Sequence, residues 1–207
     1  MKKPGLFISF EGIDGSGKST QAQLLAMRLR NEGYEVVLTR EPGGSKGAEQ
    51  IRKLVLEGET DRWSAETEIL LFTAARRDHL EKTILKALNE GKLVICDRFV
   101  DSTRVYQGKT RGELRNLVEK LTELVITREP DITLLIDMNP SVSLSRAKSR
   151  RTNEERFEDF GLELQELMRV EFLKLAKEFP CRFRLIHGQE AENKISDTIF
   201  KAVRNLL

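Results

Sequence analysis

The stretch Gly12-Ile13-Asp14-Gly15-Ser16-Gly17-Lys18-Ser19 follows directly after the apolar run Leu6–Phe10 and fits the pattern G-x-x-x-x-G-K-[ST]. Glycines at these spacings let a loop wrap closely enough for successive backbone N–H groups to point at phosphate oxygens. A helix beginning near Lys18 would add its positive N-terminal end. In loops of this kind the lysine reaches the β- and γ-phosphates and the last hydroxyl binds Mg²⁺. The sequence therefore predicts a phosphate-binding loop over Gly12–Thr20, with Lys18 as a catalytic cation and Ser19 as a metal ligand.

Short apolar runs alternate with longer amphipathic stretches along the rest of the chain. The apolar runs are Leu6–Phe10, Glu35–Thr39, Leu93–Asp97, Ile132–Asp137 and Phe183–His187. The helical patterns are Ser19–Asn31, Glu49–Leu56, Ala65–Leu88, Gly112–Thr127, Ser141–Arg150, Gly161–Phe179 and Ala191–Leu207. Apolar strands separated by helices predict an α/β fold, a parallel sheet with helices on both faces. Ligands in such sheets bind outside the carboxyl ends of the strands.

Composition excludes several classes of protein. The chain has 207 residues, which suits one domain. Lys and Arg total 35 against 33 Asp and Glu, a net charge of +2, so a nucleic-acid partner is not expected. No apolar run is long enough for a membrane span, and no secretory signal pattern follows Met1. The two cysteines have no metal-binding spacing, and the apolar run around Cys96 predicts a buried free thiol. We therefore expect a cytoplasmic protein.

Two segments after the second predicted strand are typical of a second ligand pocket. Arg40 and Glu41 precede Pro42-Gly43-Gly44, a turn at the carboxyl end of the strand, and Arg52 follows on a short helix. A plain turn with solvated charges, and a surface position for Arg52, are the alternatives. Further on, Phe72 and Arg76 are four residues apart on one helix and share a face. Together they would stack on a base and hydrogen-bond its edge, although a core Phe beside a surface Arg is the simpler interpretation.

The third predicted strand ends in Asp97-Arg98. Asp97 is placed to orient a metal-bound water, and Arg98 to bind a phosphate through two hydrogen bonds. The N-K-x-D motif with which GTP-hydrolysing switches read the base is missing, and so is the Asp-Glu strand end of motor-type ATPases. An Asp followed by Arg suits a site that holds a second anionic substrate beside the metal, which points to a kinase.

Taken together, these motifs resemble the thymidylate kinase family over essentially the whole chain. The matching residues are Phe10–Thr20, Arg40–Gly44, Phe72 with Ala74 and Arg76, Asp97-Arg98-Phe99 with Ser102, Tyr106-Gln107, and Arg156-Phe157-Glu158. The resemblance implies a three-layer P-loop kinase fold with a five-stranded parallel sheet, one nucleoside monophosphate kinase domain over residues 1–207, and a homodimer. It also implies phosphoryl transfer from ATP with Mg²⁺ to dTMP.

The resemblance assigns roles to single residues. Asp14 would bind the 3′-hydroxyl of the deoxyribose, and Arg98, Arg52 and Arg40 would hold the acceptor phosphate. Phe72 would stack on thymine, Arg76 would donate to its O4, and Thr103 would meet the N3 edge. Tyr106 would crowd the 2′ position of the sugar. Glu41 and Gln107 complete the expected substrate site.

A basic segment at about 146–158 is the predicted lid over the transferred phosphoryl group. Gly15 and Ser16 stand where some family members carry a basic residue in the loop, so the resemblance is to the branch whose lid supplies catalytic arginines. Arg150, Arg151 and Arg156 are therefore predicted to be catalytic; a solvated helix end is the alternative.

Three other functions remain open from the sequence. A deoxynucleoside kinase would use Glu41 as a base toward a neutral hydroxyl. Another nucleoside monophosphate kinase would share most of these motifs. A regulatory nucleotide-binding module would bind nucleotide without transfer. The extra arginines Arg52 and Arg98 favour an acceptor that already carries phosphate.

Overall fold

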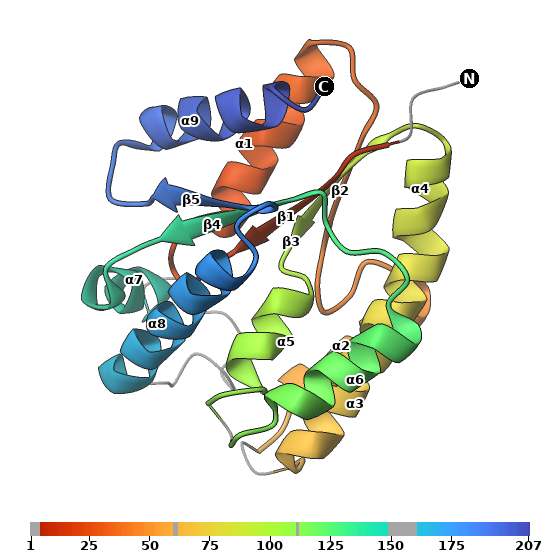
Figure 1. Ribbon diagram of the computed structural model, residues 1–207, viewed down its shortest axis with the longest axis vertical. Coiled ribbons are helices and arrows are strands. Elements are labelled where there is room, and N and C mark those ends of the chain that lie inside the picture. The colour runs from red at the N-terminus through yellow and green to blue at the C-terminus, as the bar shows by residue number, and fades with distance from the viewer. Residues whose placement is uncertain (1–4, 60–61, 111, 149–160) are drawn as a thin grey trace.

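The computed structural model describes residues 5–59, 62–110, 112–148 and 161–207. Within these residues one parallel sheet has the strand order β2-β3-β1-β4-β5 (Figure 1). The strands are β1 Phe7–Glu11, β2 Val36–Arg40, β3 Leu93–Asp97, β4 Ile132–Asp137 and β5 Phe183–His187. The predicted five-stranded parallel sheet is confirmed. β1 lies in the middle and is buried along its whole length, whereas the edge strands β2 and β5 are partly exposed.

Helices connect the strands, as parallel pairing requires. Their bounds are α1 Lys18–Asn31, α2 Lys46–Leu56, α3 Ala65–His79, the π-helical segment η1 Leu80–Ile84, α4 Leu85–Asn89, α5 Val100–Tyr106, α6 Arg115–Val125, α7 Pro140–Lys148, α8 Leu162–Glu178 and α9 Glu192–Arg204. Helix α2 begins three residues before the predicted Glu49, because the Ser45 hydroxyl caps it by accepting a hydrogen bond from the backbone N–H of Ala48. The seven-residue helix α5 was not predicted, being too short for a periodic pattern.

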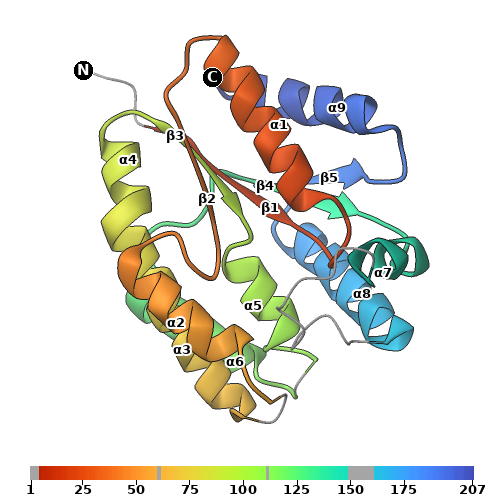
Figure 2. The same cartoon turned by 180° about the vertical axis from the view of Figure 1, so that it is seen from behind.

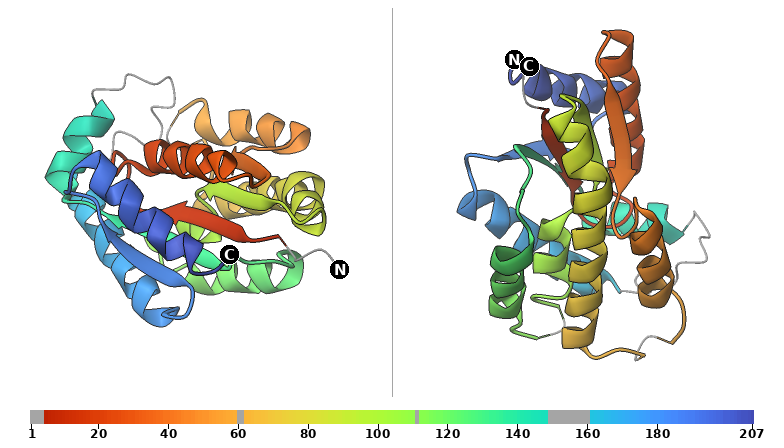
Figure 3. Two further views of the ribbon diagram at one scale, coloured as in Figure 1. Left: turned by 90° about the horizontal axis from the view of Figure 1, so that it is seen from above. Right: turned by 90° about the vertical axis from the view of Figure 1, so that its right-hand side faces the viewer.

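The two faces of the sheet are covered by different helices (Figures 2 and 3). Alternate side chains of one strand point to opposite faces. Ile8 and Phe10 of β1 therefore pack with α1 and α9, while Phe7 packs with η1, α4 and α5. A third apolar cluster joins α5 and α8 to β4 and β5. Three layers result, as predicted.

Helices α2, α3, α5 and α6 gather on the side of the sheet reached by the loops that leave β2 and β3 (Figure 2). None of the helices in the described ranges is both long and apolar enough to cross a membrane. Cys96 is buried and both cysteines are free, which confirms the prediction of a buried thiol.

A buried ion network fixes α5 against the rest of the molecule. Asp101, fully buried in α5, accepts hydrogen bonds from Arg104 (2.9 Å) and from both terminal nitrogens of Arg182 (2.6 and 2.8 Å). Burial alone would raise the pKa of Asp101. The hydrogen bonds and charges of Arg182 and Arg104 outweigh burial and hold the pKa below its usual 3.8. This network sets the position of α5, which carries several residues of the site.

Asp101→Asn should destabilise the protein by about 3–5 kcal/mol in urea unfolding at neutral pH, because Arg104 and Arg182 lose the fully buried counter-charge that they share and keep only the more exposed Glu119 and Glu129. The folded pKa of Asp101 lies below its unfolded value. The stabilisation is therefore complete above about pH 4 and is lost as pH falls through the folded pKa. The difference in free energy of unfolding between wild type and variant should therefore shrink only in acid. Glu178→Gln, which removes an exposed pair with Arg115, is the control and should cost less than about 1 kcal/mol. Equal effects of the two variants would contradict this account of α5.

Candidate active site

The glycine loop between β1 and α1 is shaped by close backbone contacts. Gly12, Gly15 and Gly17 all have positive φ angles. A Cβ on Gly12 would lie 2.6 Å from the carbonyl oxygen of Ile136, and one on Gly15 would lie 2.0 Å from that of Ser143. Glycine is therefore required at Gly12 and Gly15 by conformation and by space. The predicted strand–loop–helix context of the loop is present.

Lys18 is buried at the base of this loop, and its Nζ donates to the carbonyl oxygen of Ile13 (2.8 Å). Burial, followed by the positive charge of Arg98, lowers the pKa of Lys18 from 10.5 to about 8, against the opposing effect of Asp14, Asp97 and Glu11. The loop thus holds a cation that its surroundings do not fully compensate. An anion such as a phosphate bound there would supply the missing charge.

Ser19, at the start of α1, and Asp97, at the end of β3, lie together, as expected for a magnesium site. The Ser19 hydroxyl donates to Oδ2 of Asp97. Oδ1 of Asp97 is buried and has no hydrogen-bond partner among the described residues. A buried carboxylate oxygen without a donor is the type of ligand that Mg²⁺ takes, so the residues present fit the ion.

A pocket of about 700 Å³, partly open to solvent, lies beside the loop. Its walls come from the loop, the segment after β2, α2, α3, and the segment 98–107 that contains α5. The lining residues are Asp14, Glu41, Pro42, Arg52, Leu56, Phe72, Arg76, Arg98, Phe99, Ser102, Thr103, Tyr106 and Gln107. Except for Arg40, every residue predicted to bind the acceptor is in this set. Residues from five separate segments thus meet in one cavity.

Arg98 crosses the junction between the loop and the pocket. Its backbone has the left-handed φ of 71°, rare outside glycine, which turns the chain from β3 toward α5. Its Nη1 donates to the carbonyl of Gly12 (3.3 Å) and to Ser102 Oγ (3.0 Å), and its Nη2 donates to Asp14 and to the Tyr106 hydroxyl. Both terminal nitrogens are thus engaged, and a phosphate held by them would replace some of these contacts.

Asp14 is the counter-charge of this junction. One carboxylate oxygen accepts from Arg98, and the other accepts from the Tyr106 hydroxyl (2.7 Å). Burial would raise the pKa of Asp14, but the charges of Arg98 and Lys18 and the two hydrogen bonds lower it. Asp14 is therefore ionised and oriented toward the pocket that it lines.

Glu11 had no predicted role beyond its match to the family pattern. Its carboxylate accepts from the backbone N–H of Phe99 (2.7 Å) and from the N–H and hydroxyl of Ser102 (3.3 and 2.6 Å). Burial and the nearby Asp101 raise its pKa to about 7. Glu11 fixes the start of α5 and, through Ser102, the Arg98 guanidinium. A charged residue ending an apolar strand was the signal available in the sequence.

Arg76 and Glu41 form one wall of the pocket. Arg76 is only 3% exposed, so the simpler interpretation as a surface residue is wrong. Its Nε donates to Glu41 (2.7 Å), and its Nη2 donates to the hydroxyl of Thr103 (2.9 Å) and to the carbonyl of Phe99 (3.3 Å). These bonds hold the guanidinium at the pocket wall that Phe72 also lines.

Arg40 and Arg52 have different positions. Arg52 lines the pocket and donates to the carbonyl oxygen of Pro42 (2.5 Å). Arg40 is outside the lining; its exposed guanidinium pairs with Glu49 (3.1 Å) instead. The three predicted lid arginines, Arg150, Arg151 and Arg156, lie outside the described residues.

Helix α7, which leads to the predicted lid, packs directly on the loop. The Ser143 hydroxyl donates to the carbonyl of Asp14, and the Ser143 carbonyl occupies the space beside Gly15. This contact was not predicted, since Ser143 lies 129 residues from Asp14 in the chain. The loop conformation is therefore linked to the position of α7.

The chain is similar to known proteins of one family over nearly its whole length. The sequence profile of thymidylate kinase matches residues 10–199. The chain is 64% identical to the thymidylate kinase of Ruegeria pomeroyi over 203 residues, covering 98% of this chain and 96% of that one. The chain belongs to the thymidylate kinase family. A thymidylate kinase from Dinoroseobacter shibae is 59% identical over 95% of both chains. The crystal structure of thymidylate kinase from Ehrlichia chaffeensis superposes with a TM-score of 0.80 at 36% identity, over 97% of this chain and 100% of that one.

In this thymidylate kinase family member, Gly15→Ala should disturb the loop and α7 together. The added methyl group would collide with the Ser143 carbonyl, and the φ of +80° would be strained. We expect kcat/KM for ATP to fall on the order of 10²-fold, the effect of displacing a catalytic loop by about 1 Å. The matched control is Gly33→Ala, which has a similar φ of +89° but nothing within 4 Å of the new Cβ. It should cost about 1–2 kcal/mol of stability and leave activity unchanged. Normal activity of the Gly15 variant would refute this view of the loop.

Proposed function

We propose that this protein transfers the γ-phosphoryl group of ATP to dTMP, giving dTDP and ADP. The family membership supports this activity, and ATP is the phosphoryl donor of the family. The observation in the structure that supports it is the pocket beside the loop, whose lining includes Arg52 and Arg98 together with Asp14 of the loop. Arginines in those positions suit a substrate that already bears a phosphate.

The acceptor would lie with its base against α3 and its phosphate toward the loop. Phe72 would stack on thymine, and Arg76 and Thr103 would hydrogen-bond its edge beside Gln107. Asp14 would bind the 3′-hydroxyl next to Tyr106, and Arg98 and Arg52 would hold the phosphate. Arg40 would reach the acceptor phosphate only if its ion pair with Glu49 opened, so its role would be secondary to that of Arg98 and Arg52.

Transfer needs no strong general base, because the attacking phosphate oxygen is already ionised at neutral pH. Catalysis must align two anions that repel each other and neutralise the charge on the transferred group. Lys18 and the backbone N–H groups of Gly12–Thr20 would hold the ATP phosphates, and Arg98 would hold the acceptor against them. Mg²⁺, held by Ser19 and Asp97, would neutralise phosphate charge in the bound nucleotide.

Water must be kept from the transferred phosphoryl group, or ATP would be hydrolysed. We propose that residues 1–207 act as one nucleoside monophosphate kinase domain whose lid, at about 146–158, supplies Arg150, Arg151 and Arg156. The contact between Ser143 and the loop supports this arrangement, since α7 joins the loop to the lid segment. A homodimer and a cytoplasmic location remain predictions from the family resemblance.

A deoxynucleoside kinase is the alternative that the structure disfavours. That activity would require Glu41 to accept a proton from a neutral hydroxyl. Glu41 is buried, and its two oxygens already accept from Arg76 and His79. A carboxylate held in this way serves to orient an arginine.

With ATP and Mg²⁺, purified protein should phosphorylate dTMP fastest, dUMP more slowly, and dCMP, dGMP and thymidine at less than a hundredth of the dTMP rate. The N–H donor of Arg76 would meet the O4 carbonyl of thymine and uracil. In cytosine it would meet an amino group, which is also a donor, so the buried N–H of Arg76 would have no acceptor. A coupled assay of ADP release measures all five acceptors. Phosphorylation of thymidine but not dTMP would favour the deoxynucleoside kinase. ATP hydrolysis unaffected by any monophosphate would indicate the regulatory module.

Arg156→Ala should lower kcat on the order of 10³-fold while KM for dTMP changes little, because a lid arginine acts on the transferring group and not on the bound acceptor. Steady-state kinetics with varied dTMP separate the two constants. Arg204→Ala, at the exposed end of α9, is the control and should behave as wild type. A near-normal kcat for the Arg156 variant would remove this residue from the mechanism.

A further inference from the structure

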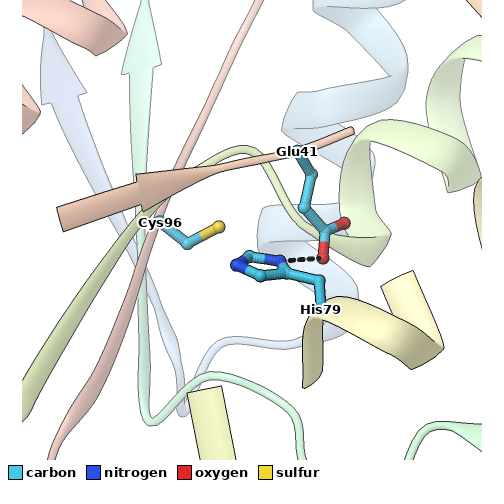
Figure 4. Close-up of side chains that lie close together, drawn as sticks. All are labelled: Glu41, His79 and Cys96. Carbon is cyan, nitrogen blue, oxygen red and sulfur yellow. Dashed lines mark hydrogen bonds and ion pairs between the residues drawn. The ribbon is translucent and has the colours of Figure 1, made fainter. Parts of the chain in front are cut away.

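Three buried side chains lie together behind the pocket wall. Glu41 follows β2, His79 ends α3, and Cys96 is in β3; one potential ligand atom of each lies within 4.8 Å of the others (Figure 4). His79 is fully buried and does not line the pocket. Neither the resemblance nor the proposed mechanism assigns it a role.

A metal ion does not suit this cluster. The Cys96 thiol donates to the carbonyl oxygen of Arg98 (3.0 Å), and burial, followed by the charges of Glu41 and Asp97, raises its pKa well above 9.0. The two oxygens of Glu41 accept from His79 and Arg76. A metal would need the thiolate and would displace those bonds. The cluster is better explained by hydrogen bonding.

The hydrogen bonds define the tautomer of His79. Nδ1 lies 3.1 Å from Oε1 of Glu41, and since an ionised carboxylate only accepts, Nδ1 carries the proton and donates. Nε2 lies 2.8 Å from the hydroxyl of Thr39, which donates to it when the ring is neutral. His79 is thus held at both nitrogens, and it fixes one oxygen of Glu41.

The other oxygen of Glu41 fixes Arg76. Arg76 Nε donates to it, Nη2 is bound by Thr103 and Phe99, and within the described chain Nη1 makes no hydrogen bond. The chain of contacts Thr39–His79–Glu41–Arg76 therefore ends at a guanidinium that lines the pocket. Two of its nitrogens are fixed, which leaves the third for a ligand.

Local structure around His79 is specialised for this contact. The π-helical turn η1 begins immediately after it, and Thr83 in that turn donates to the carbonyl of Gly44 (2.7 Å). A Cβ on Gly44 would lie 2.3 Å from Nε2 of His79 and 2.4 Å from Oγ1 of Thr39. Glycine at position 44 thus gives the imidazole the space it occupies.

We propose that His79 is a positioning residue for acceptor recognition, which orients Glu41 and through it the base-reading guanidinium of Arg76. This inference rests on the proposed function, because it assumes that Arg76 reads the O4 edge of the acceptor base. His79 affects binding of the base and its discrimination, and not the phosphoryl transfer step.

The test compares His79→Leu with His79→Asn. Leucine cannot donate to Glu41, so KM for dTMP should rise about tenfold, the loss expected for a hydrogen bond to a charged group. The ratio of kcat/KM for dTMP to that for dCMP should fall about tenfold as well, while KM for ATP stays constant and kcat stays within about threefold. Asparagine places an N–H donor near the position of Nδ1 and should restore most of the dTMP affinity and of the ratio.

The matched control is Thr83→Val, which removes the hydrogen bond from η1 to the carbonyl oxygen of Gly44 without touching Glu41. It should lower Tm and leave the ratio of kcat/KM for dTMP to that for dCMP unchanged.

If the leucine variant merely loses stability or active fraction, with KM for dTMP and the ratio unchanged, the inference is overturned. If the leucine variant folds too poorly to assay, the asparagine variant decides. A normal ratio of kcat/KM for dTMP to that for dCMP, in an asparagine variant that is no more stable than Thr83→Val, supports the proposal. A strongly lowered ratio in the asparagine variant overturns it. Wild-type protein that fails to phosphorylate dTMP would overturn the proposed function itself, a result distinct from any failure of the variants.

Discussion

Phe10 of β1 lies opposite Asp97 of β3, and Arg40 of β2 lies opposite the same aspartate, in one continuous parallel register. The strands β1, β2 and β3 therefore end at the same level, and the segments that follow them all begin at the same edge of the sheet. β1 delivers the glycine loop, β2 delivers Glu41, and β3 delivers Arg98. A parallel sheet can place side chains so distant in sequence at one edge because every strand runs in the same direction. A slip of one residue in either pairing would turn the inward-facing groups to the opposite face.

Charge is balanced tightly at this edge. Lys18, Arg76 and Arg98 are cations with little exposure, and Glu11, Asp14 and Glu41 lie among them. The carboxylates orient the arginines but do not remove the need for anions, because the lowered pKa of Lys18 shows that its surroundings still disfavour the charge. Two phosphorylated ligands would complete the balance. The cations that these carboxylates orient would thus favour anionic substrates in the pocket.

Much of the site was predictable from local pattern. The glycine loop, the Asp97-Arg98 strand end and the Phe72–Arg76 pair are encoded in short spacings, and all three lie where the sequence placed them. The burial of Arg76, the pairing of Arg40 with Glu49 and the contact between Ser143 and Asp14 were not predictable. Each depends on which neighbour a side chain meets across the fold, and periodicity within one element carries no such information. His79 was overlooked for the same reason, since its partners come from β2 and the turn after it.

By itself the sequence determined the α/β architecture and the glycine loop between the first strand and the first helix, and it predicted that a second pocket lies beside that loop. These follow from the alternation of apolar runs with helical patterns and from glycines that only a tightly wrapped loop requires. The tertiary structure decided the strand order, which arginines line the pocket, and which carboxylates orient them. The physical reason is that these properties depend on distances between residues far apart in the chain, and only the packed sheet and its helices set those distances.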